Sequence, residues 1–262
     1  MDDLDLRAAA DRDVENAVGH FAQHGDRALS ARRAGTLLVA SATNLIGAFH
    51  NAALRVAPDA DPRRVLDEAR TFGRAHGRDI VLWASTHRDH DLTTQARAEG
   101  LQLQSTALGM ALHAPPPAPA VPPDTELVQV GDRAGVDDFA AVHRSVFRDG
   151  GRDVGAVDHF ASAGGLLAPN VAAVVARVNG TPVSCAMVIH SGRAAGVYWV
   201  ATTAAARNRG LGTLVTGAVA RMGFEYGADV VVLQATELGV PVYRGMGFVP
   251  FTDYQRFLVP WE

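Results

Sequence analysis

The sequence predicts a mixed α/β protein in which two similar units follow one another. The residues before position 113 and those after position 124 have the same predicted order: strands, a helix, an apolar strand, a second helix and a last strand. Between them, residues 113–124 hold six of the 13 prolines, a composition typical of a semi-rigid extended linker. At 262 residues, the chain can form two domains with a core each. We therefore expect domains at 1–112 and 125–262, joined by this linker.

The first unit alternates apolar strands with amphipathic helices. A helix is expected directly after Asp61, because aspartate is a good N-cap and a proline follows at the first helical position. The run "DIVLWAS" is apolar throughout and predicts a buried strand. The predicted strands are 35–41, 48–56, 79–85 and 106–112, and the predicted helices are 62–77 and 91–100.

The second unit contains a clearer meander. Two turn sequences, "NGTP" and "SGRAAG", separate three apolar runs and predict hairpins. A helix precedes these strands, and helix, strand, short helix and strand follow them. The predicted helices are 135–147, 211–226 and about 240–247, and the predicted strands are 170–178, 182–190, 196–202, 229–236 and 254–260.

Composition narrows the class of protein. The chain is 48% hydrophobic and 20% charged, as in globular proteins. Its net charge of −4 and the lack of a basic stripe argue against nucleic-acid binding, and no apolar run reaches the roughly 18–20 residues that span a bilayer. The acidic N-terminus lacks the pattern of a secretory signal, and the single cysteine, Cys185, excludes an intrachain disulfide. We expect a cytoplasmic protein that contacts neither membrane nor nucleic acid.

The start of the helix at 211 has the composition of an anion site. The backbone N–H groups of residues 209–213 have no partner inside the helix, and the positive end of the helix dipole favours a phosphate there. Glycine at 210 and 212 lets a phosphate approach the backbone, and Arg207 and Arg209 add positive charge. The alternative is a glycine turn with solvated arginines.

Two runs, "RNRGLG" and "VYRGMGF", are separated by one predicted helix and one predicted strand. With this spacing, residues 125–260 resemble the acetyl-CoA-binding core of the GNAT (GCN5-related N-acetyltransferase) family. The resemblance implies two tandem GNAT-like acyltransferase domains with acetyl-CoA as co-substrate and no metal. In that family an R/Q-x-x-G-x-G/A loop binds the CoA pyrophosphate. Here this loop corresponds to Arg207, Gly210 and Gly212, with the main chain of Asn208, Arg209, Leu211 and Thr213.

The resemblance also implies further roles. The strand that ends near residue 202 should splay from its neighbour, so that backbone groups of Val200 and Thr202 hold the acetyl carbonyl and the pantetheine arm. Thr236 stands where many relatives have an asparagine that bonds this arm. Tyr243 corresponds to the tyrosine that protonates the leaving thiolate; the alternative is a tyrosine that packs its helix onto the sheet.

An amine must lose a proton before it attacks a thioester, so a base or a chain of waters is required. Glu237, at the end of an apolar strand beside the expected thioester, is the first candidate, and His190, at another strand end, is the second. Both could equally be solvated surface residues. Cys185 lies within an apolar strand and is expected to pack in the core, because a buried, unassisted thiol is inert.

The first unit lacks the pyrophosphate loop. Asp59 and Asp61 lie where a phosphate would bind, and their charge would repel it. We expect a degenerate, non-catalytic copy. His87 and His90 could suggest a metal site, but without a third spaced ligand a solvated loop is the better interpretation.

These residues predict an acetyl-CoA-dependent N-acetyltransferase that acts by direct attack of a primary amine of a small molecule. The alternative is a non-catalytic acyl-CoA-binding sensor or scaffold that keeps the loop. The acceptor is expected to contact the segment 146–165, and a homodimer is expected.

Overall fold

The computed structural model describes residues 1–25, 28–42 and 49–262. These residues form one mixed sheet with the strand order β1-β2-β3-β4-β11-β5-β10-β9-β8-β7-β6. The strands are β1 (Leu29–Arg33), β2 (Thr36–Ala40), β3 (Ala52–Arg55), β4 (Ile80–Ser85), β5 (Gln102–Leu112), β6 (Thr125–Gln129), β7 (Val171–Val178), β8 (Thr181–Ser191), β9 (Ala194–Thr202), β10 (Val230–Ala235) and β11 (Val249–Val259). The expected α/β class is confirmed. Residue 48 of the strand predicted at 48–56 lies outside the described residues.

The two units exchange their last strands. Strand β5, the last of the first unit, pairs antiparallel with β10 of the second unit, and β11, the last of the second, pairs antiparallel with β4 of the first. The exchanged strands also pair with each other along most of their length. Each unit is therefore completed by backbone hydrogen bonds to the other, which joins both into one sheet.

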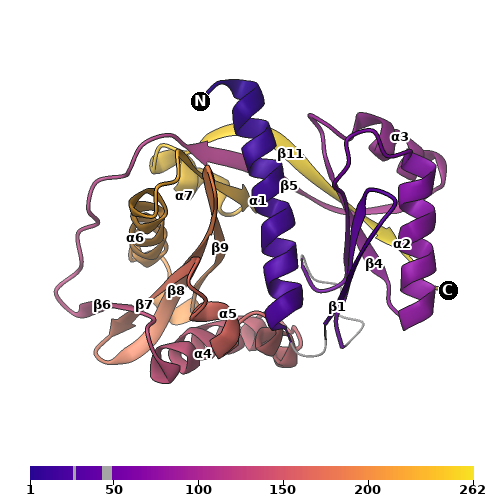
Figure 1. Ribbon diagram of the computed structural model, residues 1–262. Helices are drawn as coiled ribbons and strands as arrows, with labels where there is room; N and C mark the ends of the chain where they lie inside the picture. Colours follow the sequence, from indigo (N-terminus) through magenta and orange to yellow (C-terminus); the bar gives the residue numbers. More distant parts are fainter. Residues whose placement is uncertain (26–27, 43–48) are drawn as a thin grey trace.

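Helices cover both faces of this sheet (Figure 1). The side chains of β8 point alternately to the two faces of the sheet. Cys185 and Met187 pack in the core on the side of α4, and Ala186 and Val188 pack in the core on the side of α6. The alternation follows from the two-residue period of a strand. The longer helices are α1 (Asp3–His24), α2 (Pro62–His76), α3 (His90–Ala98), α4 (Arg133–Asp149) and α6 (Leu211–Glu225); α5 (Ala163–Leu166), α7 (Val240–Gly245) and two 3-10 turns, Val154–His159 and Ala204–Ala206, are short. None of the helices in the described ranges is long and apolar enough to cross a membrane.

Helix α1 was not predicted, and it crosses the middle of the molecule (Figure 1). Asp2 caps its N-terminus by accepting a hydrogen bond from the Asp5 N–H at 2.8 Å. Four of its ten buried residues are alanines, and the polar Asp13 and His20 are buried as well, so its apolar pattern is weak. The helix packs against β1 and β2 of the first unit and against β8 and β9 of the second. Strands β1 and β6 were also not predicted.

The linker residues have no regular structure, and Pro116 and Pro119 lie beside α6. Pro116 is buried, and its carbonyl oxygen accepts a hydrogen bond of 2.9 Å from Nη1 of Arg221 in α6. The linker is therefore held against the second unit, into which β5 enters beside β10.

Candidate active site

Strands β9 and β10 separate at their carboxyl ends. Their parallel pairing covers only Ala194–Gly196 of β9 and Val230–Val232 of β10, although β9 continues to Thr202 and β10 to Ala235. The edge of β9 from residue 197 onward is therefore open toward β10. Such an edge offers unpaired backbone donors and acceptors, which a bound ligand can satisfy.

A β-bulge at Trp199 and Val200 accompanies this separation. Here two residues of β9 face one of β8, because Ala201 pairs with Cys185 and Tyr198 with Met187. Trp199 has a φ of +50°, which is rare for a bulky side chain. Its indole stacks on Phe160 with ring centroids 3.5 Å apart, and its carbonyl oxygen accepts a hydrogen bond of 3.0 Å from Nε2 of His143. These contacts hold the bulge in place.

The loop between β9 and α6 keeps the helix N-terminus open. Gly210 forms the N-cap with a φ of +75°, and Asn208 also has a positive φ, +61°. A Cβ added at Gly210 would meet no atom within 4 Å, and one at Gly212 would meet only Oγ1 of Thr202, at 3.7 Å. The glycines therefore leave free space over the first turn, whose N–H groups have no partner inside the helix.

The two arginines of the loop are held by different contacts. Nε of Arg207 donates to the carbonyl oxygen of Thr202 at 3.4 Å, and Nη2 of Arg209 forms an ion pair of 2.6 Å with Asp124 at the end of the linker. Both side chains lie at the surface; Asp124 balances the charge of Arg209, while Arg207 forms no ion pair with a described residue.

A cavity of about 610 Å³ opens at the separated strands. Val200, Thr236 and Tyr243 line it, together with Tyr198 and Trp199 of the bulge. Both units contribute to its wall. The other lining residues are Phe49, His50, Trp83, Ala107, His143, Val146, Phe147, Arg152, Asp153, Ala156, Val197, Ala201, Leu233, Gln234 and Arg256. The cavity is thus continuous with the open edge of β9, and most of its lining residues are apolar.

Tyr243 lies on α7 with its ring against the turn that follows β10. A Cβ at Gly239 would lie 2.7 Å from Cε2 of Tyr243, so only glycine leaves room for the ring. The ring also contacts Phe248 edge-to-face, with centroids 5.9 Å apart. Burial raises the pKa of Tyr243 to about 12. The hydroxyl therefore keeps its proton at neutral pH.

Both candidate bases lie outside the cavity lining. Glu237 is exposed on the turn between β10 and α7. His190 lies near the start of the β8–β9 hairpin turn, at the end of β8 away from the bulge, where its ring contacts Tyr226. Cys185 is fully buried in the core as expected, and burial raises the pKa of its thiol.

Two histidines of the cavity are neutral. Burial lowers the pKa of His143 to about 3, so its Nε2 carries the proton that it donates to the Trp199 carbonyl. Burial, with a smaller contribution from the nearby His159, lowers the pKa of His50 to about 4. Nε2 of His50 lies 3.3 Å from the Ala156 carbonyl oxygen, and its buried Nδ1 has no hydrogen-bond partner among the described residues.

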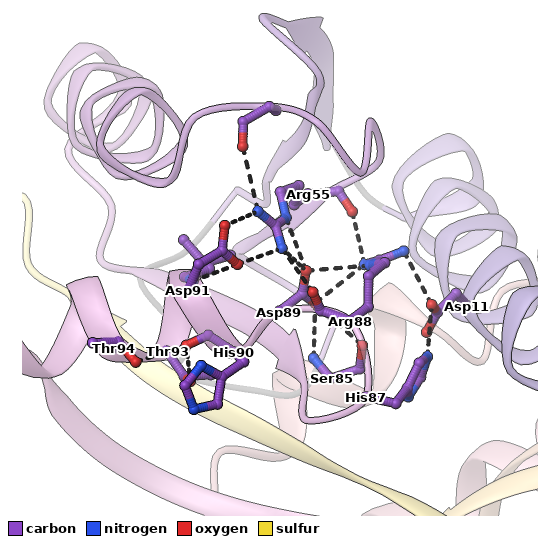
Figure 2. Close-up of polar contacts among 12 residues, drawn as sticks. Asp11, Arg55, Ser85, His87, Arg88, Asp89, His90, Asp91, Thr93 and Thr94 are labelled. Atoms are coloured by element: carbon purple, nitrogen blue, oxygen red, sulfur yellow. Dashed lines mark hydrogen bonds and ion pairs between the residues drawn. The ribbon is translucent and has the colours of Figure 1, made fainter.

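In the first unit, the corresponding place is closed by an ion-pair network (Figure 2). Arg55 ends β3 and is only 2% exposed. Its Nε donates to Asp89 at 2.9 Å, and its two terminal nitrogens bond both oxygens of Asp91 at 2.9 and 2.8 Å. Asp89 and Asp91 belong to the segment after β4. The network therefore ties together the two strand ends that separate in the second unit.

The helix N-terminus of the first unit is also occupied. The Asp61 carboxylate accepts hydrogen bonds from the N–H groups of Arg63 and Arg64 at 2.8 and 3.2 Å. An anion would have to displace this carboxylate to reach the same donors.

The interpretation of His87 as part of a solvated loop was wrong. Its side chain is only 8% exposed, and its Nε2 lies 3.0 Å from the Asp11 carboxylate of α1 (Figure 2). Its Nδ1 lies 2.8 Å from Oγ1 of Thr252 in β11. His87 thus connects α1 to the exchanged strand. Within the described ranges, no group of three or more His, Cys, Asp or Glu side chains is arranged to hold a metal ion.

Comparison with known proteins fits this geometry. Residues 138–248 match the acetyltransferase (GNAT) family. This part of the chain, less than half of its length, is similar to a GNAT domain. The match begins within α4 and ends at Phe248, and it includes the separated strands, the glycine loop and Tyr243. No curated protein matches the sequence.

Solved structures extend the likeness to the whole chain. A GCN5-related N-acetyltransferase from Kribbella flavida shares 17% identity at a TM-score of 0.71, with 95% of each chain covered. A tandem GNAT protein from the clavulanic acid biosynthesis pathway shares 16% identity at a TM-score of 0.59, with 95% of this chain and 94% of that chain covered. A GCN5-related N-acetyltransferase from Sphaerobacter thermophilus shares 15% identity at a TM-score of 0.60, with 86% and 80% covered. The expected tandem GNAT-like fold is confirmed.

Sequence reasoning found only the part of the cavity wall that belongs to the GNAT motifs. Phe49, His50 and Trp83 come from the first unit, and Arg256 comes from the exchanged strand β11. Their local sequence gives no sign that they line the cavity, because only the strand exchange brings them to the part of the chain that matches the GNAT family. The segment 146–165, from which acceptor contacts were expected, does contribute Phe147 and Arg152.

Proposed function

We propose that the protein transfers the acetyl group of acetyl-CoA to the primary amine of a small molecule, in one cavity per chain. The observation that carries this proposal is the continuity of three features: the glycine loop at the start of α6, the open edge of β9 and the cavity beneath Tyr243. Gly212 lies next to Thr202, so the loop and the open edge are neighbours.

The donors of the loop fit a pyrophosphate. The N–H groups of residues 208–213 and the side chains of Arg207 and Arg209 would hold it, since free donors and positive charge meet at one helix N-terminus. The open edge of β9 at Val200 and Thr202 would bind the pantetheine arm, and the Thr236 hydroxyl would add a contact. Acetyl-CoA supplies the acetyl group as an activated thioester.

Tyr243 is proposed as the general acid. Its phenol keeps its proton because burial raises its pKa to about 12, and it lines the cavity in which the leaving thiolate would form. A hydroxyl that remains protonated can donate to a thiolate.

Glu237 is proposed as the general base, with water molecules that carry the proton to it. Its carboxylate is exposed beyond the cavity lining, so a proton from the acceptor ammonium would reach it along a water chain. Glu237→Gln tests this role: the rate at neutral pH should fall and be recovered at higher pH, where more of the amine is already neutral.

The first unit is proposed to be non-catalytic. The Arg55 network closes the place where the strands would separate, and Asp61 occupies the helix N-terminus. The first unit supplies part of the wall of the shared cavity, namely Phe49, His50 and Trp83. A titration that gives two CoA molecules per chain would contradict this assignment.

The experiment that tests the function combines thiol release from acetyl-CoA with calorimetric titration of CoA. The amines offered are polyamines, amino acids, aminoglycosides and peptide N-termini. Turnover with one amine class, with one CoA bound per chain, supports the transferase. CoA binding without turnover across the panel favours the alternative, a non-catalytic acyl-CoA sensor. Light scattering of the same sample tests the expected homodimer.

A further inference from the structure

Arg256, a partly buried arginine of the cavity, has no carboxylate partner among the described residues. Arg256 lies in β11 and lines the cavity, with its guanidinium carbon 5.1 Å from the centre of the Trp83 ring. Its Nε is buried and has no hydrogen-bond partner, and none of the described residues forms an ion pair with the side chain. The side chain is half-buried, and burial lowers its pKa. A desolvated guanidinium without an acid is unfavourable.

The chain pairs its other buried guanidinium groups in this region. Arg55 bonds Asp89 and Asp91, and Arg88 bonds Asp11 and Asp89 at 3.1 and 3.2 Å. Removal of a charge from water is normally offset by an opposite charge and hydrogen bonds. Among the described buried guanidinium groups of this region, Arg256 is the exception, and it lines the cavity.

A second arginine of the cavity also lacks an acidic partner among the described residues. Arg152, exposed at its edge, stacks on Phe147 with its guanidinium carbon 3.8 Å from the ring centre, and it too forms no ion pair with a described residue. Among the described residues of the lining, Asp153 is the one with a carboxylate, and it accepts a hydrogen bond of 2.9 Å from the Gly155 N–H. Two arginines thus share the cavity with a single acid that is already engaged in its own turn.

Stacking on an aromatic ring leaves the edge of a guanidinium free. The N–H groups of Arg256 lie in the plane of the guanidinium, and that plane presents a two-pronged donor that matches a carboxylate. Trp83 and Phe49 stack on each other beside it, with ring centroids 5.0 Å apart, so the surrounding wall is apolar. A carboxylate bound there would be shielded from water, and the charge-assisted bonds would be strong.

We propose that the acceptor is an amine that also carries a carboxylate, as an amino acid does, and that Arg256 binds this carboxylate. Arg152 at the cavity edge adds a second positive charge. The ligand would then extend from Arg256 toward Tyr243 and Val200, with its amine at the open edge of β9. This inference rests on the proposed function, because it names the substrate of the same cavity.

The test measures binding rather than turnover. Protein saturated with CoA is titrated calorimetrically with L-amino acids of increasing side-chain length, each paired with its own primary amide, and with O-phosphoethanolamine. We expect at least one amino acid to bind about 10-fold or more tightly than its amide, the preference that a charge-assisted pair supplies. In Arg256→Gln this ratio should fall to about one, and Arg256→Lys should recover part of it.

Arg97→Gln is the matched control. Arg97 also stacks on a residue of β11, with its guanidinium carbon 5.6 Å from the Phe257 ring centre, but it lies outside the cavity lining. Its loss should leave the acid-to-amide ratio unchanged. CoA affinity and the circular dichroism spectrum of Arg256→Gln should equal those of the wild type.

Two results would overturn the inference. One is that no amino acid binds better than its amide, or that the preference survives in Arg256→Gln. The other is that only O-phosphoethanolamine binds, which would replace the carboxylate by a phosphate. Neither result bears on acetyl transfer, which thiol release measures separately. Carboxylate binding that depends on Arg256, without any thiol release, would leave the carboxylate site standing and contradict the transferase.

Discussion

The Asp13 carboxylate accepts a hydrogen bond of 2.5 Å from the Tyr198 hydroxyl, which joins α1 to β9 beside the cavity. Asp13 is fully buried, and its Oδ2 lies directly over Gly196, where a Cβ would approach it to 2.0 Å. Burial raises its pKa to about 7, against smaller opposing effects of its hydrogen bonds. This contact fixes α1 against the last residue of β9 that still pairs with β10.

The first prediction concerns stability and pH. The folded state binds the Asp13 proton more tightly than the unfolded state, whose pKa is near 3.8. The contribution of this group to the free energy of unfolding therefore falls as the pH rises from about 4 to 7, by at most about 4 kcal/mol. In Asp13→Asn this loss disappears, so the stability of the variant relative to the wild type should increase with pH and level off above about 7.

Urea denaturation at pH 5, 6, 7 and 8 measures the difference, and Asp59→Asn, at an exposed position, is the control. A difference between Asp13→Asn and wild type that stays constant across this pH range would contradict the burial of an acid with a raised pKa.

The second prediction concerns the glycine loop. Gly212→Val should weaken CoA binding about 10-fold to 100-fold, because the side chain would fill the space over free N–H groups that a pyrophosphate needs. Gly212 is preferable to Gly210 as a test, since Gly210 has a φ of +75° and a valine there would strain the backbone as well.

The control is Gly217→Ala in the same helix. A Cβ at Gly217 would make only ordinary contacts, at 3.8 Å to Met246 and 3.9 Å to Pro119, so CoA affinity should not change. Calorimetry measures both variants. Equal affinities for Gly212→Val and wild type would remove the phosphate-binding assignment of the loop.

The third prediction concerns Tyr243→Phe. The ring keeps its contacts with Gly239 and Phe248, but the proton donor is lost. We expect kcat to fall roughly 100-fold while the Kd for CoA stays unchanged. Steady-state thiol release and calorimetry separate the two quantities. A kcat equal to that of the wild type would leave Tyr243 with a packing role alone.

The fourth prediction concerns the closed site of the first unit. Arg55→Met leaves the buried carboxylate of Asp89 without its main partner and should lower the free energy of unfolding by about 3–5 kcal/mol. Arg64→Met, at an exposed position of α2, should change it by less than about 0.5 kcal/mol. Chemical denaturation checks both. A tolerated loss of Arg55 would show that the network is not needed to hold these strand ends together.

The local sequence was sufficient to predict those features that depend on residues close together in the chain. Asp61 was recognised as an N-cap because capping involves atoms only two or three positions away, and it accepts those hydrogen bonds in the structure. The hairpin turns and the glycines at 210 and 212 were found for the same reason. Helix α1 was missed because four of its ten buried residues are alanines and Asp13 and His20 are polar, so its buried face contrasts little with its exposed face.

The sequence by itself determined the α/β class with its tandem order of elements, and it predicted the motif residues from Arg207 to Tyr243, because local patterns depend on residues close together in the chain. Only the tertiary structure decided which residues complete the cavity. The exchange of β5 and β11 brings Trp83 and Arg256 to the open edge of β9, across separations of more than 50 positions. Such pairing depends on hydrogen bonds between distant strands, and no local pattern encodes them.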